Sequence, residues 1–279
     1  MRPPKSTSPL PSAATGAGDT RPPVAVAPSR RVLGMRVDHI EAPAAALIAG
    51  WSAAAPSSAR YVCGANVHMT MVAHDDPTFK DAVNAADLVL PDGVPMVWAL
   101  RALGLQQKRR VRVSTDLLRE IIGVCADRHV KVGLYGGTPQ TLAAMTANLL
   151  TAFPDLDLAF SHSPPFRPLT PEEDAAVVRE IAASGVGLLL IGIGCPKQER
   201  WMAAHTGRLD CVMMGVGAAF DLLAGKTRNA PLWMRDRGLE WVYRLVCEPR
   251  RLWRRYLYHN PRFIVLFATQ VLRSRHPAP

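Results

Sequence analysis

Gly187-Leu-Leu-Leu-Ile-Gly-Ile-Gly194, followed at once by Cys195-Pro-Lys-Gln-Glu199, is the stretch that decides the fold of this 279-residue chain. Two more apolar runs end in glycines, at residues 131–137 and 211–217. A run that is apolar on both faces suits a buried parallel strand, and glycine at its exit lets a ligand approach the backbone. A helical pattern follows each run, and its first free N–H groups attract negative charge. The three runs therefore predict strands that end at a crevice for a phosphorylated ligand.

Strand and helix patterns alternate along most of the chain. The expected strands cover 32–37, 60–63, 87–90, 131–135, 156–161, 186–192 and 211–215. The expected helices cover 44–55, 67–74, 78–86, 94–103, 115–128, 138–152, 171–183, 197–206 and 217–224. This alternation predicts an α/β fold, with a mostly parallel Rossmann-like sheet and helices on both of its faces.

Composition divides the chain into three parts. Residues 1–31 form a Pro-rich tail that we expect to be disordered, residues 32–230 form the α/β core, and residues 231–279 form a basic helical appendage. The net charge is +10, of which residues 1–31 carry +4 and residues 235–279 carry +7, so the body carries −1. A nearly neutral body argues against a broad nucleic-acid groove and favours a localised anionic partner.

The sequence also predicts a compartment. No apolar region of a secretory signal follows the early basic residues, so we expect the protein to stay in the cytoplasm. The five cysteines lie at wide spacings without a CxxC pair, which indicates reduced core thiols.

The appendage contains a basic amphipathic helix. Leu252, Trp253, Tyr256 and Leu257 fall on one helical face, and the arginines at 250, 251, 254 and 255 fall largely on the other. An anionic membrane surface selects such a helix. The apolar stretch at 263–268 is much shorter than the roughly 20 residues that span a bilayer. We therefore expect the chain to lie on the inner face of the plasma membrane as a peripheral protein.

Three polar clusters follow predicted strands: Asn66, Asp92 and the segment from Lys197 to Glu199. The carboxyl ends of parallel strands are the usual location of an α/β active site. Asp92 lies between proline and glycine, so it is also typical of a simple turn.

Five segments together resemble the WecG/TagA/CpsF family of bacterial glycosyltransferases. They cover residues 90–93, 194–201, 215–225, 230–234 and 238–256, and the resemblance extends over about residues 32 to 270. It implies transfer of a sugar from a UDP-sugar to a polyprenyl-diphosphate-linked saccharide, with inversion and without a required metal or other cofactor. The product would belong to a surface polysaccharide or a wall polymer.

The resemblance also implies roles for single residues. Asp92 matches the proposed general base, Gln198 a glutamine at the sugar, and Asn66 an asparagine suited to hold sugar hydroxyls. Gly64 stands where the family commonly has threonine, so the choice of donor or acceptor is open. Arg110 is the fourth catalytic candidate, although whether Arg110 or Arg112 faces the diphosphate stays open.

Without a metal, the departing UDP needs cations or N–H groups for stabilisation. The candidate donor-binding residues are Gly136, Gly137, Gly194, Lys197, Gly215, Gly217, Phe220, Asp221, Arg244, Arg251 and Arg255. The alternative for the appendage arginines is that they only coat a solvated helix.

Several competing interpretations exist. Asp155 and Asp157 form a DxD pattern typical of metal-dependent glycosyltransferases, but they open a predicted strand and are better explained as a solvated edge. Phe220 occupies the third glycine position of a dinucleotide fingerprint, which disfavours a nicotinamide enzyme. Three alternatives stay open. The protein could be a non-catalytic nucleotide-sugar-binding assembly protein, it could form a homo-oligomer, or its basic appendage could be a nucleic-acid arm. The charge distribution disfavours the nucleic-acid arm.

Overall fold

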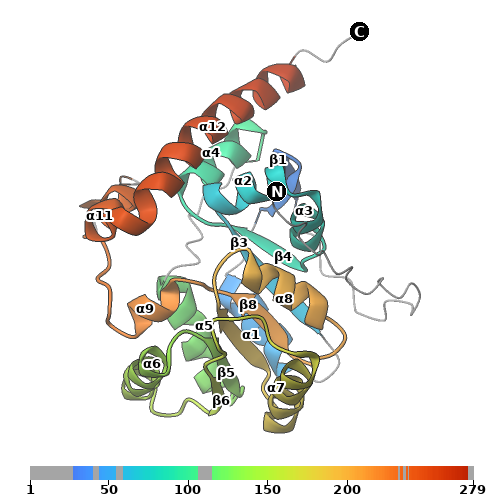
Figure 1. The fold of residues 1–279 in the computed structure, drawn as a ribbon, viewed down its shortest axis with the longest axis vertical. Coiled ribbons are helices and arrows are strands. Elements are labelled where there is room, and N and C mark those ends of the chain that lie inside the picture. The colour runs from blue at the N-terminus through green and yellow to red at the C-terminus, as the bar shows by residue number, and fades with distance from the viewer. Residues whose placement is uncertain are drawn as a thin grey trace, which may run out of the picture.

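The computed structural model of this protein describes residues 28–39, 44–54, 59–105, 115–231, 233–234, 237 and 239–275. Its centre is a six-stranded sheet in the order β4-β3-β8-β7-β5-β6, in which every neighbouring pair is parallel (Figure 1). The strands are β3 (Arg60–Ala65), β4 (Leu88–Pro91), β5 (Val132–Gly136), β6 (Leu158–His162), β7 (Leu188–Gly192) and β8 (Val212–Gly215). The predicted α/β fold is confirmed, and the bounds of these strands differ from expectation by two residues at most.

Helices cover both faces of the sheet and enclose one hydrophobic cluster on each side. One face carries α1 (Ala44–Ala53), α5 (Thr115–Asp127), α6 (Pro139–Ala152) and α9 (Ala219–Leu223). The other face carries α2 (Val67–Asp75), α3 (Pro77–Asn84), α4 (Val94–Ala102), α7 (Pro171–Ser184) and α8 (Lys197–His205).

The unbroken apolar runs follow from this two-sided cover. Successive side chains of a strand point to opposite faces of its sheet. β7 accordingly sends Leu188 and Leu190 into one cluster and Leu189 and Ile191 into the other. A strand with a core on both faces leaves no position for a polar side chain.

The single strand expected at 32–37 is wrong, because the chain forms an antiparallel hairpin there. β1 (Ser29–Val32) pairs with β2 (Met35–Asp38) through a turn at Leu33 and Gly34, which have φ of +52° and +87°. Two residues with positive φ match the twist of a tight hairpin, but leucine is a rare choice for such a turn, so the sequence carries no clear signal. Residues 29–31, assigned above to the tail, belong to β1; residues 1–27 lie outside the described part.

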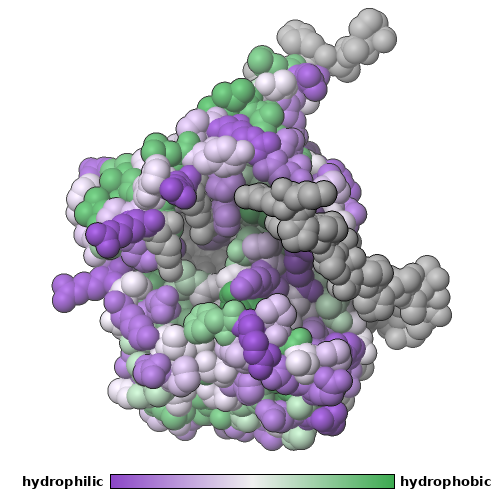
Figure 2. Space-filling model, in the orientation of Figure 1, coloured by the Kyte–Doolittle hydropathy of each residue, from purple (hydrophilic) through white to green (hydrophobic). Residues whose placement is uncertain are grey.

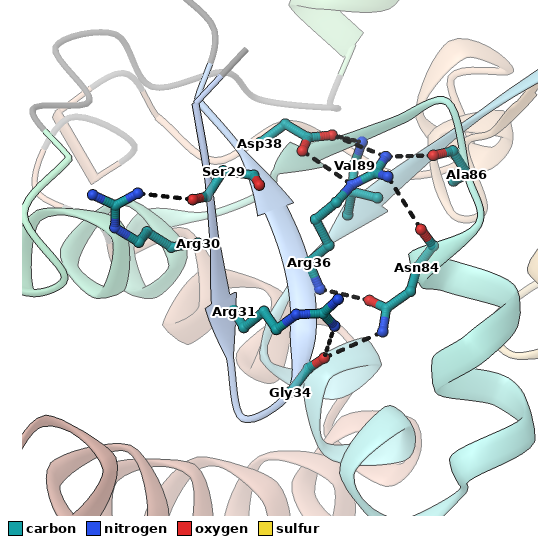
Figure 3. A network of polar contacts seen from close by, with 9 residues as sticks. All are labelled: Ser29, Arg30, Arg31, Gly34, Arg36, Asp38, Asn84, Ala86 and Val89. Carbon is teal, nitrogen blue, oxygen red and sulfur yellow. Dashed lines mark hydrogen bonds and ion pairs between the residues drawn. The ribbon is translucent and has the colours of Figure 1, made fainter. Parts of the chain in front are cut away.

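A buried carboxylate fastens this hairpin to the sheet. Asp38 accepts a hydrogen bond from the Val89 N–H at 2.8 Å and pairs with Arg36 Nε at 3.1 Å (Figure 3). The Arg36 N–H donates to Asn84 Oδ1 at 2.7 Å. Asp38 Oδ2 accepts from the Val89 N–H and from Arg36 Nη2, and Oδ1 is ion-paired with Arg36, so the buried charge has a cationic partner.

The C-terminal part comprises α11 (Glu240–Cys247) and α12 (Pro249–Arg275), and α12 lies along α2 at one end of the molecule (Figure 1). Arg262 pairs with both carboxylate oxygens of Asp75 at 2.5 and 2.6 Å. Gln270 accepts from the Leu33 N–H at 2.8 Å, and Phe263 is buried in the cluster beneath α2. The second half of α12 is therefore docked on the core.

The single apolar face expected on this helix is corrected, because apolar residues lie on two sides of it. Leu252 is buried, whereas Trp253 and Leu257 from the same expected face are exposed. The exposed large apolar side chains of α12 form what we term the outer strip: Trp253, Leu257, Tyr258, Ile264, Val265 and Leu272. At about 100° per residue they fall within an arc of about 140°. Figure 2 shows hydrophobic and hydrophilic residues side by side along this helix.

Two further expectations concern the thiols and the bilayer. None of the five cysteines, all of which lie in the described ranges, forms a disulfide. Cys63, Cys125 and Cys211 are buried, whereas Cys195 is half-buried and Cys247 on α11 is exposed. The prediction of core thiols is therefore wrong for the last two. Within the described ranges, no helix has both the length and the apolar character needed to cross a membrane.

Candidate active site

The sheet brings the predicted site residues to one edge. All six strands run in the same direction, so Asn66 after β3, Asp92 after β4 and the glycines after β5, β7 and β8 all lie at their carboxyl ends. This is the edge at which α/β proteins bind their ligands. Asp155 and Asp157 come just before β6, at the opposite, amino-terminal ends of the strands, and both are exposed. This position agrees with the interpretation that they are solvated.

Asp92 and Asn66 form a pair at this edge. The Asn66 side-chain oxygen accepts from the Met69 N–H at 3.1 Å and so caps α2. That contact leaves the Asn66 Nδ2 group to donate to Asp92 Oδ2, at 3.4 Å. The Asp92 N–H donates to the Ala65 carbonyl at 2.7 Å, which joins the turn after β4 to the end of β3. Asp92 is half-buried. Asn66 therefore holds one carboxylate oxygen, while part of the side chain stays accessible to solvent or substrate.

Gln198 lies in the first turn of α8, and its side chain covers the end of β8. A Cβ atom at Gly215 would be 2.9 Å from Gln198 Nε2, so this position needs glycine for the amide to lie there. Gln198 Oε1 accepts from the Gly194 N–H at 3.2 Å, and Nε2 donates to Glu199 at 2.8 Å. Gln198 follows β7 in the chain, but its amide reaches the end of the neighbouring strand β8. Because β3 lies between β4 and β8, the strand ends at which Asp92 and this amide lie are roughly 10 Å apart.

The glycines that end β5 and β7 allow close packing at the carboxyl ends of these strands. Gly136 has a φ of +129°, and a Cβ there would be 2.5 Å from the Gly192 carbonyl carbon. A Cβ at Gly192 would be 2.7 Å from the Phe220 ring. Phe220 is itself buried, so the structure places it beneath the edge, where it packs on Gly137 and supports the turn.

A cavity of about 230 Å³ opens between α9 and α11. Its walls carry the cations Lys226, Arg228 and Arg244 and the acids Asp221 and Glu248. Lys226 Nζ also lies 2.6 Å from Thr141 Oγ1, which places its ammonium group at the beginning of α6. The lining is completed by Ala218, Leu222, Thr227, Tyr243 and Cys247.

The predicted donor-binding residues thus meet different outcomes. Asp221 and Arg244 line the cavity, with Arg244 also paired to Glu240 at 3.1 Å. Gly217 lies close to the Gln198 amide, and Lys197 is exposed at the beginning of α8. Three predicted residues cannot be placed: Arg110 lies outside the described residues, as do the side chains of Arg251 and Arg255.

Sequence reasoning missed Lys226 and Arg228. Lys226 follows Thr141 by 85 residues, and only the packing of α9 against α6 joins them. Neither a motif nor a periodic pattern carries that information. The sequence indicates only the helix start that Lys226 meets. Thr138 before Pro139 is typical of a capping hydroxyl at the beginning of a helix, and Thr138 does cap α6.

The comparison with known families agrees with this geometry. The model of the Glycosyl transferase WecG/TagA/CpsF family matches residues 30–277, which is nearly the whole chain. The matched region includes the sheet, the polar edge with Asp92 and Gln198, and both C-terminal helices. The chain therefore belongs to the WecG/TagA/CpsF family and is a glycosyltransferase of the kind that builds polysaccharides or wall polymers.

Proposed function

We propose that this glycosyltransferase moves a sugar from a UDP-sugar to a saccharide on a polyprenyl diphosphate, inverting the anomeric carbon without a metal ion. The reaction takes place at the cytoplasmic surface of the plasma membrane. The observation that carries the proposal is the Asp92–Asn66 pair, at 3.4 Å, on the same sheet edge as a cavity lined by three cations.

Asp92 acts as the general base. As the acceptor oxygen attacks the anomeric carbon, its proton passes to the Asp92 carboxylate, and the bond from that carbon to the UDP oxygen breaks. A single-displacement reaction of this kind inverts the anomeric centre. The Asn66 amide donates to one carboxylate oxygen and so holds the group in position for the acceptor.

The cations in the cavity stabilise the departing UDP. In the absence of a metal ion, the negative charge that develops on the diphosphate must be met by side chains and N–H groups, and such stabilisation is often the largest catalytic contribution. Lys226 is well placed for this role, since it lies between the cavity and the beginning of α6. Arg228 and Arg244 supply further positive charge, and Arg110, Lys197, Arg251 and Arg255 stay candidates for the same role.

The outer strip of α12 supports the membrane assignment. Six large apolar side chains on one helix are exposed, and Arg254 lies over the Trp253 ring at 5.3 Å. Exposed apolar groups of this number mark a surface that contacts another apolar phase. Aromatic and basic groups on such a helix are typical of an interface with anionic lipid.

The direct experiment offers the purified protein a panel of UDP-sugars together with a short-chain lipid diphosphate saccharide, with and without a chelator. The proposal predicts transfer of one sugar with inverted configuration, at a rate that the chelator leaves unchanged. Binding of UDP without transfer to any acceptor would favour a non-catalytic assembly protein. Loss of transfer with the chelator would refute metal independence.

A further inference from the structure

Glu199 is a carboxylate that the proposed reaction does not use, and its burial requires an explanation. It follows Gln198 in α8 and is 0% exposed. One oxygen accepts the hydrogen bond from Gln198 Nε2, while the other, Oε2, has no hydrogen-bond partner within the described part of the chain. No lysine or arginine among the described residues pairs with it.

The contrast with Asp38 shows what is unusual. Burial raises the pKa of the Glu199 carboxyl above its ordinary value. Hydrogen bonds from Gln198, from the Glu199 backbone N–H and from the Cys195 thiol only partly oppose that rise. Burial raises the pKa of Asp38 as well, but Asp38 has a guanidinium partner in Arg36 and accepts from the Val89 N–H. Glu199, in contrast, has no cationic partner among the described residues. A buried, incompletely satisfied carboxylate lowers the stability of a fold. The contribution of Glu199 must therefore lie elsewhere than in stability.

The amide of Gln198 can adopt two orientations that differ by a half-turn of its terminal group. The Gly194 N–H can only donate, so it selects the orientation with Gln198 Oε1 toward the turn after β7. Glu199 Oε1 accepts, so it selects the same orientation by binding Nε2. Reversing the amide would place a donor against a donor and an acceptor against an acceptor, and the two contacts together exclude it.

We propose that Glu199 is a positioning residue that holds the Gln198 amide with its oxygen toward the glycine turns, ready to accept from a hydroxyl of the donor sugar. This inference rests on the proposed function, since it assigns the donor sugar to Gln198. Gln198 Oε1 lies 3.6 Å from the point where a side chain at Gly217 would begin, so glycine leaves space beside this oxygen.

Three variants of Glu199 separate positioning from packing. Glu199→Gln keeps an oxygen that accepts from Gln198 and should retain kcat/KM for the donor within about 5-fold of the wild type. Glu199→Met keeps the length but removes the acceptor, and should lower kcat/KM for the donor by about 10- to 100-fold, the effect of one hydrogen bond to a charged group. Glu199→Ala should lose at least as much and should also be less stable, because it leaves a cavity.

Stability should change little in Glu199→Met while activity falls. Replacing a buried carboxylate by a thioether removes its desolvation cost but leaves the buried Gln198 Nε2 group without its acceptor. Because these two effects oppose each other, the midpoint of thermal unfolding should stay near that of the wild type. The KM for the lipid-linked acceptor should stay unchanged. Asp38→Asn is the matched control: it alters the other buried carboxylate and should lower the unfolding midpoint without changing the KM for the donor.

A readout without catalysis keeps this inference separate from the proposed function. In ¹H–¹⁵N spectra, the side-chain NH₂ signals of Gln198, assigned by their loss in Gln198→Leu, should exchange slowly with solvent in the wild type and in Glu199→Gln. They should exchange at least about 10-fold faster in Glu199→Met. Equal exchange in all three, or a wild-type kcat/KM in Glu199→Met, would overturn the positioning role. If the wild type transfers no sugar while the exchange rates differ as stated, the proposed function fails but the amide is still held by Glu199.

Discussion

The outer strip of α12 yields a quantitative prediction for membrane binding. Leu257 and Ile264 are 68% and 65% exposed, so replacing both by serine removes apolar surface that the fold does not bury. Burying a whole leucine or isoleucine side chain contributes about 1.5–3 kcal/mol. With two thirds of each side chain available to lipid, the pair contributes about 2–4 kcal/mol. At 1.4 kcal/mol per factor of ten, the double variant should bind vesicles about 30-fold or more weakly.

The assay is cosedimentation with vesicles of zwitterionic and anionic phospholipid. Leu150→Ser is the matched control, because Leu150 is an exposed leucine on α6, far along the chain from α12. The unfolding midpoint of the double variant should equal that of the wild type. Unchanged vesicle binding in the double variant would refute the assignment, and strong binding of single-stranded nucleic acid with a steep salt dependence would favour a nucleic-acid arm instead.

Point variants test this surface better than a truncation after Trp233. Such a truncation would also remove Phe263 from the core and Arg262 from its pair with Asp75. We expect the truncated chain to be less stable for that reason alone. A loss of activity on truncation would therefore not identify the membrane as its cause.

Three further variants test the glycine turns, the cavity and a buried histidine. Gly136→Ala should lower the midpoint of thermal unfolding or prevent folding, because the new Cβ would be 2.5 Å from the Gly192 carbonyl carbon. Gly104→Ala is the control: Gly104 also has a positive φ but lies in open space, so this variant should lower the midpoint much less. Lys226→Gln should weaken UDP binding about 10-fold by calorimetry, and Lys131→Gln should not; equal affinities would remove Lys226 from the diphosphate site. Burial lowers the pKa of His205 below its ordinary 6.5, so the unfolded state binds the proton more readily and the free energy of unfolding should fall as the pH drops below about 6.5. Denaturant titrations across that range should show a smaller fall in His205→Gln, and an unchanged slope would contradict the assignment.

The sequence determined the sheet well because its strands are apolar on both faces and end in glycines. The runs at 131–137, 187–194 and 211–217 became β5, β7 and β8 with small shifts at their ends. Order in the sheet was not predictable, since β3 pairs with β8 across about 150 residues of chain. The hairpin was missed because its turn uses Leu33 rather than an Asn-Gly or Asp-Gly pair.

The site was predictable only where short motifs carry it. Asp92, Asn66 and Gln198 follow strands and match a family pattern, so reading the sequence finds them. Lys226 reaches α6 through tertiary packing, and Glu199 is buried where α8 packs against α3, β8 and β3. The sequence also did not show which apolar side chains of α12 pack on the core and which are exposed, because a helical pattern does not indicate which side of a helix meets the core.

The most direct test of the account compares sugar transfer by the wild type, Asp92→Asn and Asp155→Asn, with the donor and acceptor that support the highest rate. Asp155 is an exposed aspartate at the opposite edge of the sheet and belongs to the DxD pattern, so it controls for the loss of one carboxylate. Removal of a general base typically costs about 10²- to 10⁴-fold in kcat. We predict a loss of that size in Asp92→Asn, with UDP binding retained, and a wild-type rate in Asp155→Asn. A wild-type rate in Asp92→Asn would contradict the account.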